Sequence, residues 1–219
     1  MVSISRRIAL FAVSALALAA CGAANGAATP GAGASSSALG HTLGSADAPI
    51  TIIEYASPTC PACKFFHDAI KPVLQERFIS TGKVQFIFKD YPLNSIDVAA
   101  YAIARCAGEG RFFDVLDDLF ANQEGIRQAA ASGVVTTALL AVAQRHGIPD
   151  QEAFDACMND ADIRQAIADT YASGEQYSVD GTPTFIINGV KRNFSGDFTN
   201  PEGFSRHLDG LLATLEAGN

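Results

Sequence analysis

The sequence predicts an α/β fold in which a block of helices interrupts a small sheet. Two apolar, β-branched segments flank an amphipathic segment between residues 50 and 88. No convincing strand occurs in residues 95–177, whereas residues 178–219 offer two short strands and a helix. The expected order is therefore a strand–helix–strand unit, a run of helices, and a strand–strand–helix unit.

The first unit begins with a buried strand. Ile50–Tyr55 is an apolar, β-branched run bounded by prolines, which favours a strand covered on both faces. Residues 61–78 carry apolar side chains at helical spacing, and Pro72 within them predicts a kink. Val84–Phe88 follows a glycine and is expected to be the second strand, which completes the unit.

Residues 95–177 are predicted to be a helical insertion into a sheet-containing domain formed by residues 42–94 and 178–219. The spacing of apolar residues indicates helices near 95–107, 111–121, 134–147, 150–158 and 161–176. Glycines are expected to separate these helices, at Gly108, Gly125, Gly133 and Gly147.

The chain is expected to close with a hairpin and a helix. Pro183–Ile187 has the composition of a strand, and the following Asn188-Gly189 is typical of a hairpin turn. A partner strand is expected at Val190–Phe194. Pro201 then opens a last helix that runs to Leu215.

Residues 1–20 have the character of an export signal. Arg6-Arg7 precede the uncharged apolar run Ile8–Ala20, which is too short to span a bilayer comfortably. Small residues then lead to Cys21, which resembles the bacterial lipoprotein signal, where cleavage precedes a cysteine that carries the lipid. The alternative is an ordinary secretory signal cut after one of the preceding alanines.

Residues 21–41 are expected to form a flexible tether, because they are mainly Ala, Gly, Ser, Thr and Pro. A lipid on Cys21 implies a protein of the bacterial periplasm or cell envelope that is anchored to a membrane. The net charge of −8 argues against nucleic acid as a partner, since the electrostatic attraction to phosphate is missing.

The candidate reaction centre is Cys60-Pro-Ala-Cys63, which follows the first strand and opens a helix. At that position, unpaired backbone N–H groups and the positive end of the helix dipole favour a thiolate on Cys60. Cys63, one turn into the helix, is expected to be more buried and to act as the resolving thiol. Pro61 suits the first helical turn, where its missing N–H costs nothing.

A zinc site and a structural disulfide are the competing interpretations of this motif. Cys60, Cys63 and His67 could supply three ligands, but the chain has no second C-x-x-C to close a four-ligand site. A disulfide across three residues restrains little of the unfolded chain. Thiol–disulfide exchange is therefore favoured, with no metal or cofactor, and His67 is expected on the helix surface.

The combination of motifs resembles the DsbA-like thiol–disulfide oxidoreductases of the thioredoxin superfamily. The resemblance rests on Cys60-Pro-Ala-Cys63, on the helical insertion, and on Gly181-Thr-Pro-Thr-Phe185 before the hairpin, and it extends over residues 43–215. It implies a thioredoxin fold with an inserted helical domain, and a Cys60–Cys63 disulfide that is redox-active.

The resemblance also implies roles for residues away from the motif. In that family the proline, here Pro183, is cis and lies against the disulfide, and Thr182 offers its backbone to a substrate chain. Family members often hold an acid beneath the disulfide that moves a proton to or from the inner thiol. Glu54 is the candidate, with Lys89 as its partner; the alternative is that Glu54 points outward at the strand edge.

One residue of the motif departs from the strongly oxidising relatives. They carry a histidine in the variable dipeptide, where it stabilises the thiolate, and this chain has Ala62. We therefore expect the pKa of Cys60 to be less depressed than in those relatives, and the protein to be a milder oxidant.

The helical insertion contains Cys106 and Cys157, and some relatives carry a disulfide in this region. The chain has 5 Cys, so acylation of Cys21 would leave an even number in an oxidising compartment. A Cys106–Cys157 disulfide is the expectation, and two free buried thiols are the alternative.

The resemblance implies a protein that introduces disulfides into reduced secreted or envelope proteins, with a membrane partner of DsbB type that reoxidises it, and the short segment 22–41 favours a monomer. A disulfide isomerase or reductase with the same centre is the alternative, although residues 22–41 are too short for the dimerisation domain typical of isomerases. From a different class, the paired thiols could bind copper(I). Only 2 Met occur, and no His-rich stretch supports that function.

Overall fold

The structure, a computed structural model, describes residues 40–218, which fold around a five-stranded sheet. The strands lie in the order β1-β3-β2-β4-β5, with β2 and β3 parallel and the other neighbouring pairs antiparallel. Their bounds are β1 His41–Leu43, β2 Ile50–Ala56, β3 Val84–Asp90, β4 Thr184–Ile187 and β5 Val190–Asn193. The predicted α/β fold is confirmed, and β2 occupies the centre of the sheet.

The N-terminal predictions fall largely outside the described residues. The export signal at residues 1–20, the lipidation site Cys21 and the tether up to residue 39 all lie there. His41, which the sequence placed in the tether, instead belongs to β1, where it pairs with Phe88 and is 2% exposed. A three-residue edge strand is too short to show the alternation that identifies longer strands, so the pattern did not reveal it.

The helix after β2 runs from Pro61 to Ile79 and widens into π-helical turns twice. Its successive segments are α2 Pro61–Phe65, the π-helical η1 Phe66–Ile70, α3 Lys71–Leu74 and the π-helical η2 Gln75–Ile79. Pro72 lies between the two wide stretches. Because proline has no N–H and its ring crowds the carbonyl one turn earlier, the predicted irregularity takes the form of widened turns.

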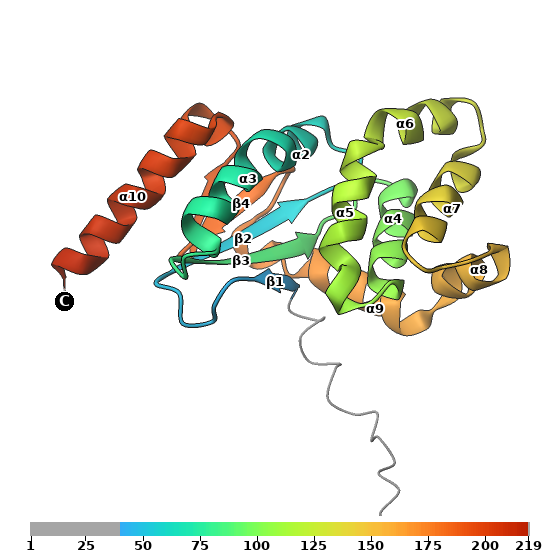
Figure 1. Ribbon diagram of the computed structural model, residues 1–219, viewed down its shortest axis with the longest axis horizontal. Helices are drawn as coiled ribbons and strands as arrows, with labels where there is room; N and C mark the ends of the chain where they lie inside the picture. Colours follow the sequence, from blue (N-terminus) through green and yellow to red (C-terminus); the bar gives the residue numbers. More distant parts are fainter. Residues whose placement is uncertain (1–39, 219) are drawn as a thin grey trace, which may run out of the picture. The chain divides into compact units, whose positions relative to one another are not determined.

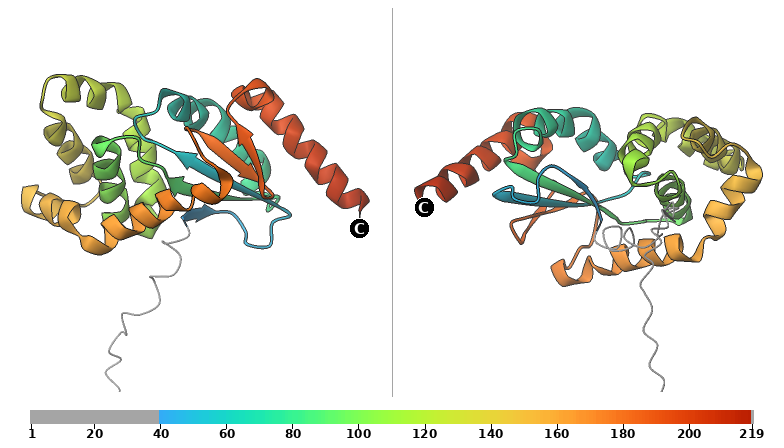
Figure 2. Two further views of the ribbon diagram at one scale, coloured as in Figure 1. Left: turned by 180° about the vertical axis from the view of Figure 1, so that it is seen from behind. Right: turned by 60° about the horizontal axis from the view of Figure 1, so that its bottom comes forward.

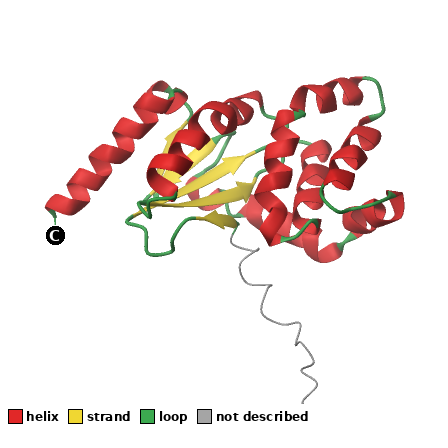
Figure 3. Cartoon of the chain, viewed as in Figure 1, coloured by secondary structure: helices red, strands yellow, loops and turns green. Residues whose placement is uncertain are grey.

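The predicted helical insertion is present and contains no strand (Figure 3). Its α-helices are α4 Ser95–Cys106, α5 Phe112–Ala121, α6 Gln123–Ala131, α7 Val135–Arg145, α8 Gln151–Asn159 and α9 Ala161–Ala172. Short 3₁₀ turns occur at η3 Glu109–Arg111, η4 Glu175–Tyr177 and η5 Gly196–Thr199, and the chain closes with α10 Pro201–Ala217.

One prediction in this block is wrong. Gly125 was expected to separate helices, but it lies inside α6. Ile126 is the one buried residue of α6, and the helix is mainly polar, so it offers few apolar side chains from which a sequence pattern could identify it. A glycine inside an exposed helix costs only about 1 kcal/mol, which the rest of the helix tolerates.

Helices cover both faces of the sheet. The helix from Pro61 to Ile79 and α10 lie on one face, whereas α9 crosses β3 on the opposite face (Figures 1 and 2). The contacts between helix and sheet are largely aromatic: Phe66 packs against Phe86, Phe185 and Phe204. This cluster fixes the start of the helix above the carboxyl end of β2.

Two links tie the helical insertion together and to the sheet. Arg105 of α4 donates to Asp90, the last residue of β3, at 2.6 Å, and the Asp90 side chain is fully buried. Cys106 at the end of α4 forms a disulfide with Cys157 of α8, across a sequence separation of 51 residues. The helices nearest the sheet and those farthest from it are thereby held in one unit.

The Cys106–Cys157 link is expected to stabilise the fold by about 4 kcal/mol, because closing a loop of this length restrains the unfolded chain. Denaturant unfolding of the wild type and of Cys106→Ala, which breaks the link at an exposed position, measures this difference. The double variant Cys106→Ala/Cys157→Ala separates the contribution of the buried Cys157 side chain. Equal unfolding free energies for wild type and Cys106→Ala would contradict the prediction.

Candidate active site

The two cysteines of the motif occupy the junction between β2 and α2. Cys60 is the N-cap of α2, and its sulfur accepts a hydrogen bond from the backbone N–H of Cys63 at 3.4 Å. Pro61 occupies the first helical turn, as expected. Cys60 is 8% exposed and Cys63 is fully buried, and both are free thiols. The structure therefore represents the dithiol form, with Cys60 as the sulfur that solvent can reach.

The environment separates the acidities of the two thiols. The pKa of Cys60 is lowered from 9.0 to about 6, chiefly by the hydrogen bond from the Cys63 side chain and further by the backbone N–H groups of Cys63 and Ala62, against the effect of partial burial. The pKa of Cys63 is raised well above 9.0, first by burial, then by Cys60 and by the charge of Glu54. Near neutral pH, the outer sulfur is a thiolate and the inner sulfur is a thiol.

The loop before β4 completes the surroundings of Cys60. The Thr182–Pro183 peptide bond is cis, and the Cys60 sulfur lies 3.3 Å from the Thr182 carbonyl, to which it donates when it is protonated. β4 pairs with β2, which brings this loop beside the motif although more than a hundred residues separate them in sequence. The structure thus brings together Cys60, Cys63, Thr182 and Pro183, which the sequence analysis named as one site.

A buried carboxylate fixes the turn that carries Cys60. Asp97 of α4 is fully buried and accepts from the Ser57 hydroxyl at 2.8 Å, the Thr59 N–H at 2.9 Å and the Leu93 N–H at 2.8 Å. Sequence analysis missed this residue. Asn94 caps α4, but nothing local indicates that the acid three residues later bonds to a loop some 40 residues away.

Helix α6 provides a second support for the same turn. The Gln123 amide donates to the Pro58 carbonyl at 2.7 Å and to the Cys60 carbonyl at 3.0 Å. The Cys60 carbonyl also accepts from the Lys64 N–H at 3.1 Å, so Gln123 adds a second hydrogen bond there and joins α6 to the start of α2. Gln123 was also missed, because it opens the one helix that the sequence pattern did not predict.

The predicted pairing of Glu54 with Lys89 is wrong. In the parallel register of β2 and β3, Glu54 lies opposite Phe88, and Lys89 lies opposite Tyr55. Because side chains alternate between the faces of a sheet, Glu54 and Lys89 point in opposite directions. The alternative of an exposed Glu54 is also excluded, since its side chain is fully buried at the central strand.

The partner of Glu54 is His67, which had been expected on the helix surface. His67 Nε2 lies 3.0 Å from Glu54 Oε2, and the His67 side chain is 2% exposed. The prediction failed because residues four apart in a helix share a face, and Cys63 faces the core. His67 is therefore engaged with Glu54 rather than with the thiols. Among residues 40–218, no group of three or more His, Cys, Asp or Glu side chains is arranged to hold a metal ion.

Comparison with known sequences gives a consistent set of relatives. A family model described as thioredoxin matches residues 36–209. "Putative protein-disulfide oxidoreductase" of Rickettsia bellii is 31% identical over 155 residues, which cover 70% of this chain and 59% of that protein. "Probable disulfide bond formation protein D" of Bacillus cereus is 26% identical over 159 residues, covering 70% of this chain and 72% of that protein. The chain thus spans only about three fifths of the Rickettsia relative.

Solved structures give the same result. Alpha-DsbA1 of Wolbachia pipientis superposes with a TM-score of 0.70 at 26% identity, over 81% of this chain and 92% of that one. BdbD of Bacillus subtilis, in its oxidised form, has a TM-score of 0.63 at 20% identity, over 78% and 92%, and supports the fold alone. None of the helices between residues 40 and 218 is long and apolar enough to cross a membrane.

The rate at which an alkylating reagent modifies Cys60 is expected to rise between about pH 5 and 7, because the thiolate is the reactive species and its pKa is about 6. Replacing Cys63 by Ala removes the side chain that lowers this pKa most, so the midpoint should move toward 9.0. Cys63→Ser retains a donor and should lie nearer the wild type. Rapid-mixing alkylation with mass detection measures all three, and a wild-type midpoint above about pH 8 would contradict the assignment.

Proposed function

Because this chain belongs to the thioredoxin family, we propose that it is a protein thiol–disulfide oxidoreductase of DsbA type that introduces disulfides into exported proteins. The observation that supports this most directly is the difference between the two sulfurs: an accessible thiolate at Cys60 beside a buried thiol at Cys63. The resemblance to alpha-DsbA1 of Wolbachia pipientis adds support.

In the proposed reaction, the oxidised protein holds a Cys60–Cys63 disulfide. A client thiolate attacks the Cys60 sulfur, because Cys63 is fully buried and cannot be reached. The disulfide breaks, its electron pair goes to Cys63, and Cys63 takes up a proton. A second client thiolate then attacks the client sulfur of the mixed disulfide, and Cys60 leaves as a thiolate. The client loses two electrons, and the cysteine pair gains them.

The low pKa of Cys60 drives this reaction toward client oxidation. A thiol of low pKa is a good leaving group, and stabilising the thiolate stabilises the reduced form of the protein, which raises its reduction potential. Among C-x-x-C proteins, the pKa of the outer cysteine falls to about 3.5 in the strong oxidant DsbA. A pKa of about 6 for Cys60 therefore supports a milder oxidant. Ala62 also supports a milder oxidant, because it lacks the histidine that stabilises the thiolate in stronger oxidants.

The client chain is proposed to bind beside Thr182. Its backbone would lie along the loop that precedes β4, as a strand added next to Cys60. Pro183 has no N–H, so it leaves the neighbouring backbone groups of the client free to pair with Thr182. Such recognition depends on main-chain atoms, which suits an enzyme with many different clients.

The proposal extends to location and partners. The sequence of residues 1–21 supports export with a lipid on Cys21, followed by a tether, so the protein would act in the bacterial periplasm or cell envelope. A membrane protein of DsbB type would reoxidise it. Within the chain, residues 42–94 and 178–219 would provide the exchange site, and residues 95–177 the insertion that supports it.

Oxidised protein mixed with a reduced two-cysteine peptide is expected to form one peptide disulfide for each protein disulfide consumed. Cys60→Ser should abolish the reaction. Cys63→Ala cannot form the Cys60–Cys63 disulfide, so it is first treated with glutathione disulfide, which leaves Cys60 in a mixed disulfide with glutathione. A client thiolate should then displace glutathione and remain joined to Cys60, which captures natural clients. Cys106→Ala/Cys157→Ala, outside the site, is the matched control and should react as the wild type. Isomerisation of scrambled disulfides without net oxidation, or copper(I) binding without exchange, would overturn the proposal.

The reduction potential is expected to lie below about −120 mV, the value for DsbA. Equilibration with glutathione at several ratios, followed by alkylation and mass measurement, gives this number. Ala62→His restores the residue that stabilises the thiolate in stronger oxidants, so it should raise the potential and lower the pKa of Cys60. A wild-type potential above about −120 mV, or no change in Ala62→His, would contradict the argument.

A further inference from the structure

We propose that His67 connects the buried Glu54 to a surface cavity and thereby moves the proton that Cys63 gains or loses in each exchange. His67 is a positioning residue in this scheme, because it acts on Cys63 through Glu54. The inference rests on the proposed function, and it adds His67 and the adjoining cavity to the site.

Cys63 needs such a route because of where it lies. When the Cys60–Cys63 disulfide opens, the electron pair arrives on a sulfur with no exposure to solvent. Its nearest polar contact besides Cys60 is the backbone N–H of Ser57 at 3.5 Å, which donates to sulfur and has no proton to release at neutral pH. Burial favours the neutral thiol. A proton must therefore reach Cys63 in one direction of the reaction and leave it in the other.

We assign the exchange of that proton to Glu54. Its charge is among the causes that raise the pKa of Cys63, so the carboxylate lies within electrostatic reach of the sulfur. Oε2 is bound to His67, whereas Oε1 is buried and has no hydrogen-bond partner within residues 40–218. Burying a carboxylate with one unpartnered oxygen lowers the stability of the fold. Such groups are typical of functional sites.

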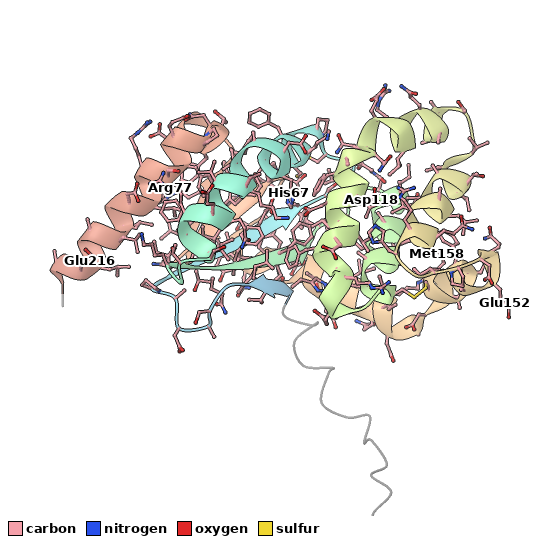
Figure 4. The ribbon with its side chains drawn as sticks, in the orientation of Figure 1. His67, Arg77, Asp118, Glu152, Met158 and Glu216 are labelled. Atoms are coloured by element: carbon pink, nitrogen blue, oxygen red, sulfur yellow. A yellow bond between two sulfur atoms is a disulfide. The ribbon has the colours of Figure 1, made fainter. Side chains whose placement is uncertain are left out.

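His67 spans the distance from this carboxylate to the surface. Its Nε2 faces Glu54 at 3.0 Å, and its Nδ1 lies 3.7 Å from Asp117 Oδ1 of α5, with no hydrogen-bond partner within the described part of the chain. Asp117 in turn accepts from Lys71 Nζ at 2.7 Å, and its side chain is 58% exposed. Figure 4 shows His67 between the helix of residues 61–79 and α5. The imidazole thus has one nitrogen on each side.

The His67 side chain borders a cavity. His67, Lys71 and Asp117 line a cavity of about 410 Å³, which is large enough to admit solvent. The rings of Phe88 and Phe120 pack against the imidazole, and Phe120 also lines the cavity. An imidazole can accept a proton at one nitrogen and release one from the other, which is the chemistry that this position requires.

The charged groups around His67 come from four elements. Glu54 faces it from β2, Asp117 from α5 and Lys71 from α3, while Asp68 of its own element η1 lines the cavity and pairs with Lys64. β3 and α5 also contact His67 through uncharged rings, those of Phe88 and Phe120. His67 therefore has one carboxylate on each side and one ammonium group at the cavity.

The proposed proton movement balances the exchange. During client oxidation, the disulfide bond breaks, Cys63 receives the electron pair and takes the proton from Glu54, and Glu54 regains one from the cavity through His67. During reoxidation, Cys63 gives its proton to Glu54 as its sulfur attacks Cys60 in a mixed disulfide. The proton then leaves through His67. No reactant beyond the thiols, the disulfide and water is required.

Reoxidation by glutathione disulfide tests this in two separable steps. Cys60 thiolate first attacks glutathione disulfide, and Cys63 then loses its proton and displaces glutathione from Cys60. Acid quenching and mass measurement follow both steps from about pH 5 to 9. In His67→Gln, whose amide still donates to Glu54 but transfers no proton, the second step should slow about tenfold or more, and the first should stay within about twofold.

Two further variants sharpen the test. In His67→Ala, free imidazole added to the buffer should restore the second step, because the cavity adjoins the vacated position. His146→Gln is the matched control: this histidine pairs with Asp118, away from the site, and both steps should match the wild type. If His67→Ala does not fold, His67→Gln decides alone.

The two possible failures are distinguishable. A wild type that forms no mixed disulfide and oxidises no dithiol peptide would end the proposed function itself. A wild type that exchanges normally, with an unchanged second step and pH profile in His67→Gln, would overturn the role of His67 alone. A slowed second step in His67→Ala that imidazole does not restore would assign His67 a structural role and also overturn the inference.

Discussion

The site depends on the hydrogen bonds that converge on one sulfur. Cys60 lies where β2 has ended and α2 begins, so the Cys63 thiol and the backbone N–H groups of Ala62 and Cys63 all reach its sulfur. Each bond is stronger when that sulfur is charged. Burial of Cys63 has the opposite effect on the inner thiol. One short turn of chain thus produces two cysteines with different acidities. Because of that difference, the client attacks Cys60, and Cys60 is also the thiolate that leaves.

This arrangement requires a turn that does not move, and the helical insertion provides it. Asp97 of α4 holds Ser57 and Thr59, and Gln123 of α6 holds the carbonyls of Pro58 and Cys60. The insertion is in turn joined to β3 by Arg105 and Asp90 and is cross-linked internally by its disulfide. The insertion therefore acts at the reaction centre through its helix ends, although it contains neither active cysteine.

Local features of the sequence were sufficient for the order of elements and for the cysteine pair with Pro183. Strand composition, helical spacing and the turn residues are properties of neighbouring residues, so they can be detected without a structure. The features that were missed are long-range or weakly patterned. β1 has three residues, and α6 is mainly polar and buries one residue, so each offers few apolar positions to a sequence pattern. Asp97 and Gln123 act on a turn that is distant in sequence, so their roles depend on packing.

The pairing of Glu54 shows where sequence reasoning could have gone further. Proximity along the predicted sheet favoured Lys89, but in a parallel pair the residue opposite Glu54 is Phe88, and Lys89 faces the other side. The helical face of Cys63 already includes His67, four residues later. Two periodicities, of the strand and of the helix, therefore place an acid and an imidazole toward each other beneath the motif. A buried carboxylate that meets a histidine rather than a lysine has a partner able to release a proton at neutral pH, which a lysine of ordinary pKa does not do.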